Sequence, residues 1–217
     1  MKSIIVSGGT IEDGFALGFL EKEKTDYLIA ADRGLAFFHR NNIHPDCIVG
    51  DFDSAGAELP QWYRTHTDIP VHSFRPEKDM TDTDIAVKEA IRAGASEIIL
   101  LGCTGTRLDH VLSNIFNLRL LREQGILGRI VDQHNRITMP VGYSYRICRE
   151  EQFGKYVSFF PCDGRVTGLT LRGFAYPLSG AELVQGDGGL TVSNEIAAEA
   201  AEACWESGSL LVIESRD

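Results

Sequence analysis

The chain has 217 residues, of which 43% are hydrophobic and 24% are charged, a composition typical of a soluble globular protein with one large or two small domains. The formal net charge of -10 argues against a nucleic-acid partner, because a phosphate backbone needs a basic surface. The short N-terminal apolar run ends at two glycines, so neither a signal peptide nor a membrane span is expected. Five cysteines without metal-ligand spacing indicate free thiols and a cytoplasmic protein.

The first 130 residues alternate short apolar runs with helical patterns. Strands buried on both faces are predicted at SIIV (3–6), YLIAA (27–31), CIVG (47–50) and EIILLG (97–102). Helices are predicted at 34–42, at 83–94 and at 111–125, the last with an apolar stripe of Val111, Leu112, Ile115, Phe116 and Leu118. Gly94 and Gly125 are the expected helix stops. This order predicts an α/β domain over residues 1–130 with a mainly parallel sheet.

From about residue 131 to residue 217 the pattern changes to strand-like runs between Gly, Pro and Asp turns. These runs lie at 155–164, 165–178, 188–196 and 208–215. They predict a smaller all-β domain, a sandwich or roll. The alanine-rich stretch at 195–208 has helical propensity, but a helix is not expected there because a short β domain has little room for one.

Polar residues follow the predicted strands at their carboxyl ends. Asp32 follows one strand, Asp51 and Asp53 follow the next, Asp79 and Asp82 follow VHSF (71–74), and the segment CTGTRLDH (103–110) follows a fourth. In open α/β sheets, ligands bind in the crevice outside these strand ends. Taken alone, GDFDS (50–54) could be an ordinary polar turn, but unrelated turns would populate both edges of the sheet. The shared edge favours one binding site.

The segment EKDMTDTDIAVKEA (77–90) adds Asp79, Asp82 and Asp84 at the start of a helix. Helix capping and the helix dipole account for part of this acidity. They do not account for Asp51 and Asp53 at the same edge. Crowded carboxylates repel one another unless a cation neutralises them, and oxygen ligands of this kind suit Mg²⁺ held partly by substrate phosphates. A Mg²⁺ polyphosphate site is therefore predicted.

The segment LGCTGTRLDHVLSN (101–114) offers the complementary charge. Backbone N–H groups at Thr104 and Gly105 precede a helix and can face an anion. Arg107 can donate two hydrogen bonds to phosphate, with Asp109 and His110 orienting it or each other. The alternative is a simple ion pair between Arg107 and Asp109 at the helix start. SGGT (7–10) is a weaker phosphate-loop candidate, since it fits neither dinucleotide nor P-loop patterns.

Four segments taken together resemble bacterial thiamine pyrophosphokinases: GDFDS (50–54), KDMTDTDIA (78–86), GCTGTRLDHVLSNI (102–115) and SNE (193–195). The resemblance implies a Mg²⁺-dependent enzyme that moves the β,γ-diphosphate of ATP to the hydroxyl of thiamine and releases AMP. It also implies an N-terminal α/β domain, a C-terminal β-sandwich that contributes to the thiamine pocket, and a homodimer with active sites between subunits.

The resemblance also implies roles for single residues. The metal-binding acids are Asp51, Asp53 and Asp82, and the nucleotide-binding residues are Thr104, Gly105, Arg107, Asp109 and His110. Asp32 corresponds to an acid near the substrate cleft, and Ser193 and Asn194 to a turn in the thiamine pocket. Asp79 belongs to the same cluster, beside the metal ligands or paired with Lys78. Because it is not expected to bind the metal directly, we expect Asp79 to accept the proton of the thiamine hydroxyl. Two departures are Thr106, where a second Gly is usual, and the final strand SLLVIES (209–215), which lacks an aromatic found in some relatives.

Two other functions fit the same residues. A Mg²⁺-dependent phosphohydrolase could use the acids with water as the nucleophile. A non-catalytic thiamine or nucleotide sensor could keep the pocket without needing so complete a set of acids. The acidic segments together with Arg107 favour the transferase.

Overall fold

The computed structural model of the chain describes residues 1–52, 58–74, 80–186 and 189–217. These residues form two compact units, the first made of Met1–Asn117 and Ile130–Gln133, the second of Leu118–Arg129 and His134–Asp217. Helix α5 (Leu108–Glu123) and strand β6 (Leu127–Val131) each contain a point where the chain passes from one unit to the other. None of the helices in the described ranges is both long and apolar enough to span a membrane.

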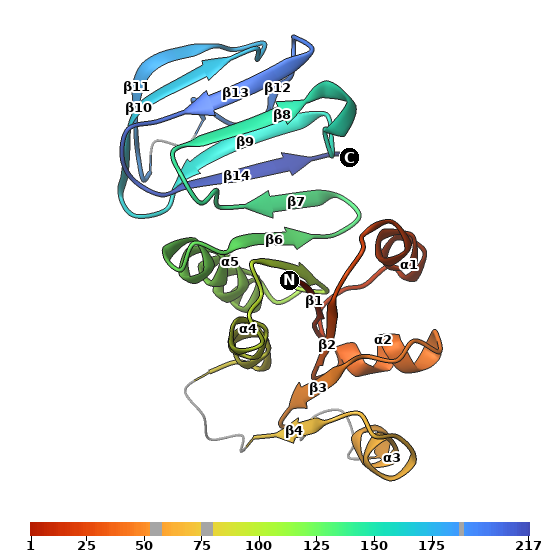
Figure 1. The fold of residues 1–217 in the computed structure, drawn as a ribbon. Coiled ribbons are helices and arrows are strands. Elements are labelled where there is room, and N and C mark those ends of the chain that lie inside the picture. Colours follow the sequence, from red (N-terminus) through yellow and green to blue (C-terminus); the bar gives the residue numbers. More distant parts are fainter. Residues whose placement is uncertain (53–57, 75–79, 187–188) are drawn as a thin grey trace. The chain divides into compact units, whose positions relative to one another are not determined.

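The first unit is built on a parallel sheet with strand order β5-β1-β2-β3-β4 (Figure 1). The strands are β1 (Lys2–Val6), β2 (Tyr27–Ala31), β3 (Cys47–Gly50), β4 (Val71–Ser73) and β5 (Glu97–Leu101). The four predicted apolar runs are all strands of this sheet, which confirms the α/β prediction. Their side chains are buried on both faces because helices cover both, as Ile4, Ile5, Ile29, Ile48 and Ile99 show with no exposed surface.

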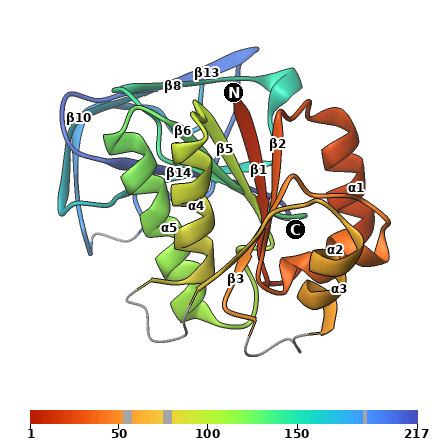
Figure 2. The same ribbon diagram turned by 60° about the horizontal axis from the view of Figure 1, so that its bottom comes forward.

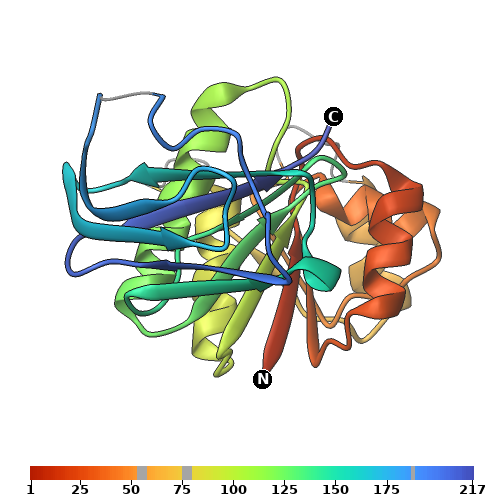
Figure 3. The same cartoon turned by 90° about the horizontal axis from the view of Figure 1, so that it is seen from above.

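Helices lie on both faces of this sheet (Figure 2). On one side are α1 (Asp13–Lys22), α2 (Gly34–Arg40) and α3 (Glu58–His66), and on the other are α4 (Asp82–Arg92) and the start of α5. The view from above separates the same two groups, with the red and orange helices on one side of the strands and the yellow helix on the other (Figure 3). The predicted helices α2, α4 and α5 are confirmed, whereas α1 and α3 were not predicted.

The ends of α4 follow local chemistry. Thr81 caps its N-terminus by accepting a hydrogen bond from the Asp84 N–H, and the Asp84 carboxylate accepts one from the Thr81 N–H. This reciprocal capping box satisfies two N–H groups that the helix itself leaves unpaired. At the other end Gly94 adopts a φ of +89°, a conformation that favours glycine, and so stops the helix as predicted.

The apolar stripe predicted for α5 is wrong in part. Leu118 is fully buried, but Leu112 and Phe116 are 53% and 57% exposed. The buried residues among the first ten of the helix are instead Asn114 and Asn117. A buried amide is stable only if its polar atoms are hydrogen-bonded, so these two residues indicate specific partners on the inner side of α5.

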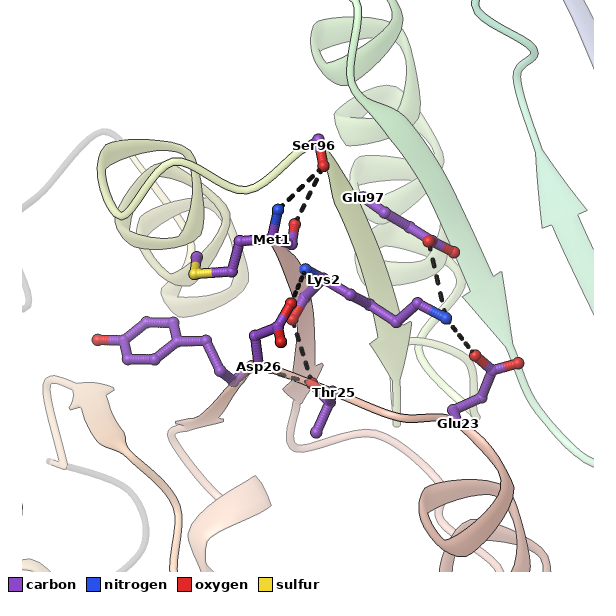
Figure 4. Close-up of polar contacts among 8 residues, drawn as sticks. Met1, Lys2, Glu23, Thr25, Asp26, Ser96 and Glu97 are labelled. Atoms are coloured by element: carbon purple, nitrogen blue, oxygen red, sulfur yellow. Dashed lines mark hydrogen bonds and ion pairs between the residues drawn. The ribbon is translucent and has the colours of Figure 1, made fainter.

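The first residues of β1 are fixed by polar contacts to two neighbouring segments (Figure 4). The Lys2 ammonium forms ion pairs with Glu23 and Glu97, and the Lys2 N–H donates to the Asp26 carboxylate. The terminal ammonium of Met1 donates to the Ser96 hydroxyl. These contacts hold the amino ends of β1, β2 and β5 in register, at the edge opposite the strand ends that carry the predicted site.

The second unit contains two antiparallel groups of strands. One has the order β12-β9-β14-β7 and the other β11-β10-β13-β8. The strands are β7 (Asn135–Thr138), β8 (Ser144–Cys148), β9 (Tyr156–Pro161), β10 (Arg165–Arg172), β11 (Leu178–Val184), β12 (Asn194–Glu195), β13 (Ala200–Cys204) and β14 (Leu210–Ser215), and a short 3₁₀ helix covers Arg149–Glu151.

Both groups of strands contribute to one apolar core, as expected for a β-sandwich. Phe159 and Val212 come from the first group, and Leu171 and Ala203 from the second, all with at most 1% exposure. The alanine-rich stretch is strand β13 and not a helix, as predicted, because its residues alternate between buried and partly exposed positions.

A buried carboxylate links the strands of this unit. Glu214 on β14 has no exposed surface, and it lies opposite Arg136 on β7. Its two oxygens accept hydrogen bonds from the Arg136 guanidinium at 2.8 and 2.7 Å, from the Tyr145 hydroxyl at 2.8 Å and from the Phe153 N–H at 3.1 Å. Burial, followed by the nearby Glu214 charge, raises the pKa of Tyr145, so its hydroxyl stays protonated and remains a donor.

Replacement of Glu214 by Ala is expected to destabilise the protein by about 3–5 kcal/mol, because it leaves the Arg136 charge half-buried without its partner. Urea unfolding would measure the loss. The matched control is Glu182→Ala, which breaks an exposed pair with Arg165 in the same unit and should cost at most ~1 kcal/mol. Equal losses in the two variants would contradict a special role for Glu214.

Candidate functional site

The strand order places the loops after β1 and β5 side by side. The chain leaves β1 toward β2, β3 and β4 on one side, and later returns to β5 on the other side of β1. The carboxyl ends of β1 and β5 therefore form a topological switch point, where the connections diverge and leave a crevice open to a ligand. SGGT (7–10) follows β1 and GCTG (102–105) follows β5, so both segments line this crevice.

The two loops approach each other so closely that glycine is required. The Gly9 N–H donates to the Gly102 carbonyl, and the Thr10 N–H to the Thr104 carbonyl, both at 2.8 Å. A Cβ atom on Gly9 would lie 2.3 Å from the Thr104 carbonyl oxygen, and Gly102 has a φ of +63°. The hydrogen bonds use the N–H groups of Gly9 and Thr10, which weakens SGGT as a phosphate loop.

Three carboxylates from three elements meet beside these loops. Asp32 follows β2, Asp51 follows β3, and Asp82 begins α4. One oxygen from each lies within 4.8 Å of an oxygen of the other two. The structure thus brings Asp51 and Asp82 together as predicted, and adds Asp32, which was expected near the substrate cleft. Asp53, the third predicted metal ligand, lies outside the described residues.

Asp32 combines a positive φ with a buried carboxylate oxygen. Its φ is +48°, and its N–H donates to the Val49 carbonyl at 2.8 Å, which aligns the ends of β2 and β3. Its Oδ1 is buried and has no hydrogen-bond partner among the described residues. Burial is the main cause that raises its pKa, and the charges of Asp82 and Asp51 raise it further. An unsatisfied carboxylate oxygen beside two others is the donor set that a hard cation satisfies.

The β5–α5 loop supplies the opposite side of the crevice. No residue of the described ranges accepts a hydrogen bond from the backbone N–H of Gly105 or Thr106, so both can face an anion. The exposed Arg107 guanidinium pairs with Asp109, and this hydrogen bond lowers the pKa of the Asp109 carboxyl. The helix-start ion pair is therefore present in the structure, and its exposure leaves Arg107 free to exchange Asp109 for another anion.

Buried polar contacts fix the walls of the crevice. The Asn114 side-chain amide donates to the Cys103 carbonyl at 2.8 Å, which anchors the loop to α5. The hydroxyls of Ser7 and Thr83 are 2.9 Å apart, which anchors the first turn of α4 to the loop after β1. Burial raises the pKa of the Cys103 thiol to about 12, so it remains protonated and does not act as a nucleophile.

The result is a cavity of about 490 Å³ within the first unit, large enough for part of a nucleotide. The predicted residues on its wall are Asp32, Asp51, Asp82, Thr104, Gly105, Arg107 and His110. Asp109 is not on the wall but pairs with Arg107. The cavity is lined both by the acids and by the β5–α5 loop, an arrangement suited to a metal-bound polyphosphate.

The remaining predicted residues lie elsewhere. Asp79 is outside the described residues. Ser193 and Asn194 belong to the second unit, where Ser193 is exposed with a φ of +57°. Asn194 is 2% exposed, and its amide both accepts from the Tyr176 N–H and donates to the Tyr176 carbonyl. The Asn194 side chain therefore fixes the turn that presents Ser193.

Several features of this crevice could not be predicted from the sequence pattern. The buried Asn114 and Asn117 were not singled out, because polar residues within a predicted helix are common. Asp32 was singled out, but its place beside Asp51 and Asp82 depends on the pairing of β2 with β3. The sequence did indicate the site in one way, because acids and glycines directly follow several of the predicted strands.

Comparisons with known proteins cover nearly the whole chain. Residues 20–127 match the family described as "Thiamin pyrophosphokinase, catalytic domain", and residues 144–204 match "Thiamin pyrophosphokinase, vitamin B1 binding domain". The thiamine pyrophosphokinase of Bacillus subtilis is 33% identical over 190 residues, which are 87% of each chain.

Solved structures agree with this match. The thiamine pyrophosphokinase structure from Bacillus subtilis is 30% identical with a TM-score of 0.88, and covers 100% of both chains. The structure from Geobacillus thermodenitrificans is 32% identical with a TM-score of 0.85, and covers 100% of this chain and 98% of that one. The chain belongs to the thiamine pyrophosphokinase family of enzymes.

Proposed function

We propose that the chain transfers the β,γ-diphosphate of ATP to the hydroxyl of thiamine, giving thiamine diphosphate and AMP in a Mg²⁺-dependent reaction. The observation that carries this proposal is the cavity of the first unit, in which three converging carboxylates face an arginine and free backbone N–H groups. Such a cavity is suited to phosphoryl-type transfer, where positioning and charge neutralisation supply most of the catalysis.

The residues present fit Mg²⁺. Asp32, Asp51 and Asp82 would hold it, with Asp53 as the further ligand expected from sequence. The ion prefers carboxylate oxygens and water in octahedral geometry at about 2.1 Å, and the separation of up to 4.8 Å between these oxygens is within reach of small side-chain movements. When bound, Mg²⁺ would neutralise negative charge on the polyphosphate.

The chain's own groups then orient the donor. Arg107 would exchange its pair with Asp109 for two hydrogen bonds to phosphate, while Asp109 and His110 guide that movement. The N–H groups of Gly105 and Thr106 would donate to a phosphate oxygen. The thiamine hydroxyl oxygen bonds to the β-phosphorus as the bond to AMP breaks, and the hydroxyl proton passes to a carboxylate, for which Asp79 is the candidate.

The second unit would contribute to the thiamine pocket through the turn at Ser193 and Asn194, and the protein would act as a cytoplasmic homodimer with the active site completed by the partner subunit. The match of residues 144–204 to a vitamin B1 binding domain supports the role in thiamine binding. The dimer and the location rest on the resemblance and on the cysteine content.

The test of the transfer is AMP release from ATP and Mg²⁺, measured with and without thiamine. Thiamine-dependent AMP together with an equal amount of thiamine diphosphate is the expected result. Phosphate release without thiamine would instead identify a phosphohydrolase. Binding of thiamine or ATP without turnover would identify a sensor.

Replacement of Asp51 or Asp82 by Asn is expected to lower the transfer rate at least about 100-fold, because each change removes a carboxylate that would hold the metal ion, and the metal ion compensates negative charge in the transition state. Both proteins should stay folded, since each change removes a repelling carboxylate. Asp13→Asn, which breaks an exposed pair with Arg40 on the helical surface, is the matched control and should keep the rate. Full activity in Asp51→Asn would refute the site.

Replacement of Asp32 by Asn is expected to raise the Tm of the metal-free protein at pH 7 and to abolish its stabilisation by Mg²⁺. The raised pKa means that the folded state disfavours the ionised carboxylate, so stability is lost as pH rises above the ordinary value of 3.8 and stays lost above the folded pKa. Asn removes this cost and tolerates the positive φ at this position.

Thermal unfolding at several pH values, with and without Mg²⁺, measures both effects. The difference in Tm between the two metal-free proteins should disappear below about pH 4, where Asp32 is protonated in both folded and unfolded states. Asp109→Asn controls for loss of an exposed acid that lies beside the crevice but not on its wall. A variant at Asp32 that is less stable at pH 7 and still responds to Mg²⁺ would contradict this assignment.

A further inference from the structure

The first turn of α4 gives three successive residues three different contacts. Asp82 lies in the carboxylate cluster, and Thr83 meets the Ser7 hydroxyl at 2.9 Å. Asp84 points away from both, because successive helical residues are rotated by about 100°. The position of Asp82 therefore depends on the contacts that hold the next two residues, Thr83 and Asp84.

Asp84 is held from a second helix. Its Oδ1 accepts a hydrogen bond of 2.7 Å from the side-chain amide of Asn117 on α5, and its Oδ2 accepts one of 2.9 Å from the Thr81 N–H. Both carboxylate oxygens are therefore used. Asn117 is 7% exposed, so its hydrogen bond to Asp84 is shielded from water, and few water molecules can compete for it.

We infer that Asn117 is a positioning residue for the metal site, acting through Asp84 on the orientation of Asp82. This inference rests on the proposed role of Asp82 as a metal ligand. Asn117 holds the Asp84 carboxylate by a hydrogen bond, and Asp84 in turn completes the capping box of α4 with Thr81. The capping box orients the first turn of the helix and therefore sets the position of the Asp82 carboxylate. Ser7 fixes the same turn from the other side.

The hydrogen-bond chemistry explains why an amide is required at position 117. The Oδ2 atom of Asp84 already accepts from the Thr81 N–H, so its other oxygen, Oδ1, needs a neutral donor on a side chain that is long enough to reach it. A carboxylate at position 117 would repel Asp84, and an apolar side chain would leave the Asp84 oxygen without its partner. Asn117 also lies on the helix whose first turn carries His110, so one element supports both sides of the cavity.

The test is the affinity for Mn²⁺, measured by electron paramagnetic resonance of the free ion, on the full chain without nucleotide or thiamine. Asn117→Asp is expected to weaken Mn²⁺ binding by about 10-fold to 100-fold, the range seen when a residue that orients a ligand is lost. If that variant fails to fold, Asn117→Ala serves in its place. Urea unfolding reports stability separately.

The decisive variant exchanges the two side chains, D84N together with N117D. The new Asn at position 84 can still accept from the Thr81 N–H with its oxygen, and can donate its amide to the new carboxylate at position 117. Mn²⁺ affinity should return to within about 3-fold of the original value, since the coupling between two contacting residues is restored. A role in packing alone would not give this rescue.

Leu118→Ala is the matched control, because Leu118 is fully buried next to Asn117 on the same helix but makes no polar contact. It should lower stability and leave Mn²⁺ affinity unchanged. Normal Mn²⁺ binding by Asn117→Asp, equal weakening by Leu118→Ala, failure of the exchanged pair to recover, or no Mn²⁺ binding by the original protein would each overturn the inference. Mn²⁺ binding that needs Asp82, without thiamine-dependent AMP release, would instead overturn the proposed function and leave the positioning role intact.

Discussion

Repulsion among the carboxylates of Asp32, Asp51 and Asp82 is the constraint on which the first unit depends. The electrostatic free energy of each carboxylate would fall if its neighbours moved away. Asp32 also has a buried carboxylate oxygen that accepts no hydrogen bond from the described residues. Three such groups stay within reach of one another only because rigid elements hold them. The pairing of β2 with β3 fixes two of the acids, and the capped start of α4 fixes the third.

The backbone at this site is strained as well as charged. Asp32 and Phe52, which flank the ends of β2 and β3, have φ values of +48° and +55°. Aspartate tolerates this region, but for a bulky residue such as phenylalanine it is costly. The Phe52 ring is 7% exposed and packs against Gly50, so burial of the ring offsets part of this cost. Backbone strain and charge repulsion at the site cost free energy, and the packing of the sheet beneath the site offsets this cost.

The second unit uses a buried charge for the opposite purpose. Glu214 accepts four hydrogen bonds, two of them from the cross-strand cation Arg136, so its charge is compensated inside the protein. The Oδ1 atom of Asp32 has no hydrogen-bond partner among the described residues, so this oxygen can accept a cation from solution. The contrast separates a carboxylate that stabilises the fold from one that is available for binding.

The sequence by itself determined the fold class, the strands of the first sheet and the segments that carry the site. Buried parallel strands have long apolar runs, and acids or glycines directly after such runs must lie at one edge of the sheet. The absence of a helix from the alanine-rich stretch at 195–208 was also predictable, because a short β unit leaves little room for one; the strand at Ala200–Cys204 was not predicted. These properties are local or follow from a single topological rule.

Only the tertiary structure decided which acids meet and what holds them. Asp32 joined the cluster through the register of β2 on β3, which no spacing in the chain reports. On α5, periodicity predicted an apolar inner face with Leu112 and Phe116, whereas the folded helix turns Asn114 and Asn117 inward. Helical spacing identifies candidate faces, but the choice between them depends on hydrogen-bond partners, here the Cys103 carbonyl and Asp84, that come from distant parts of the chain.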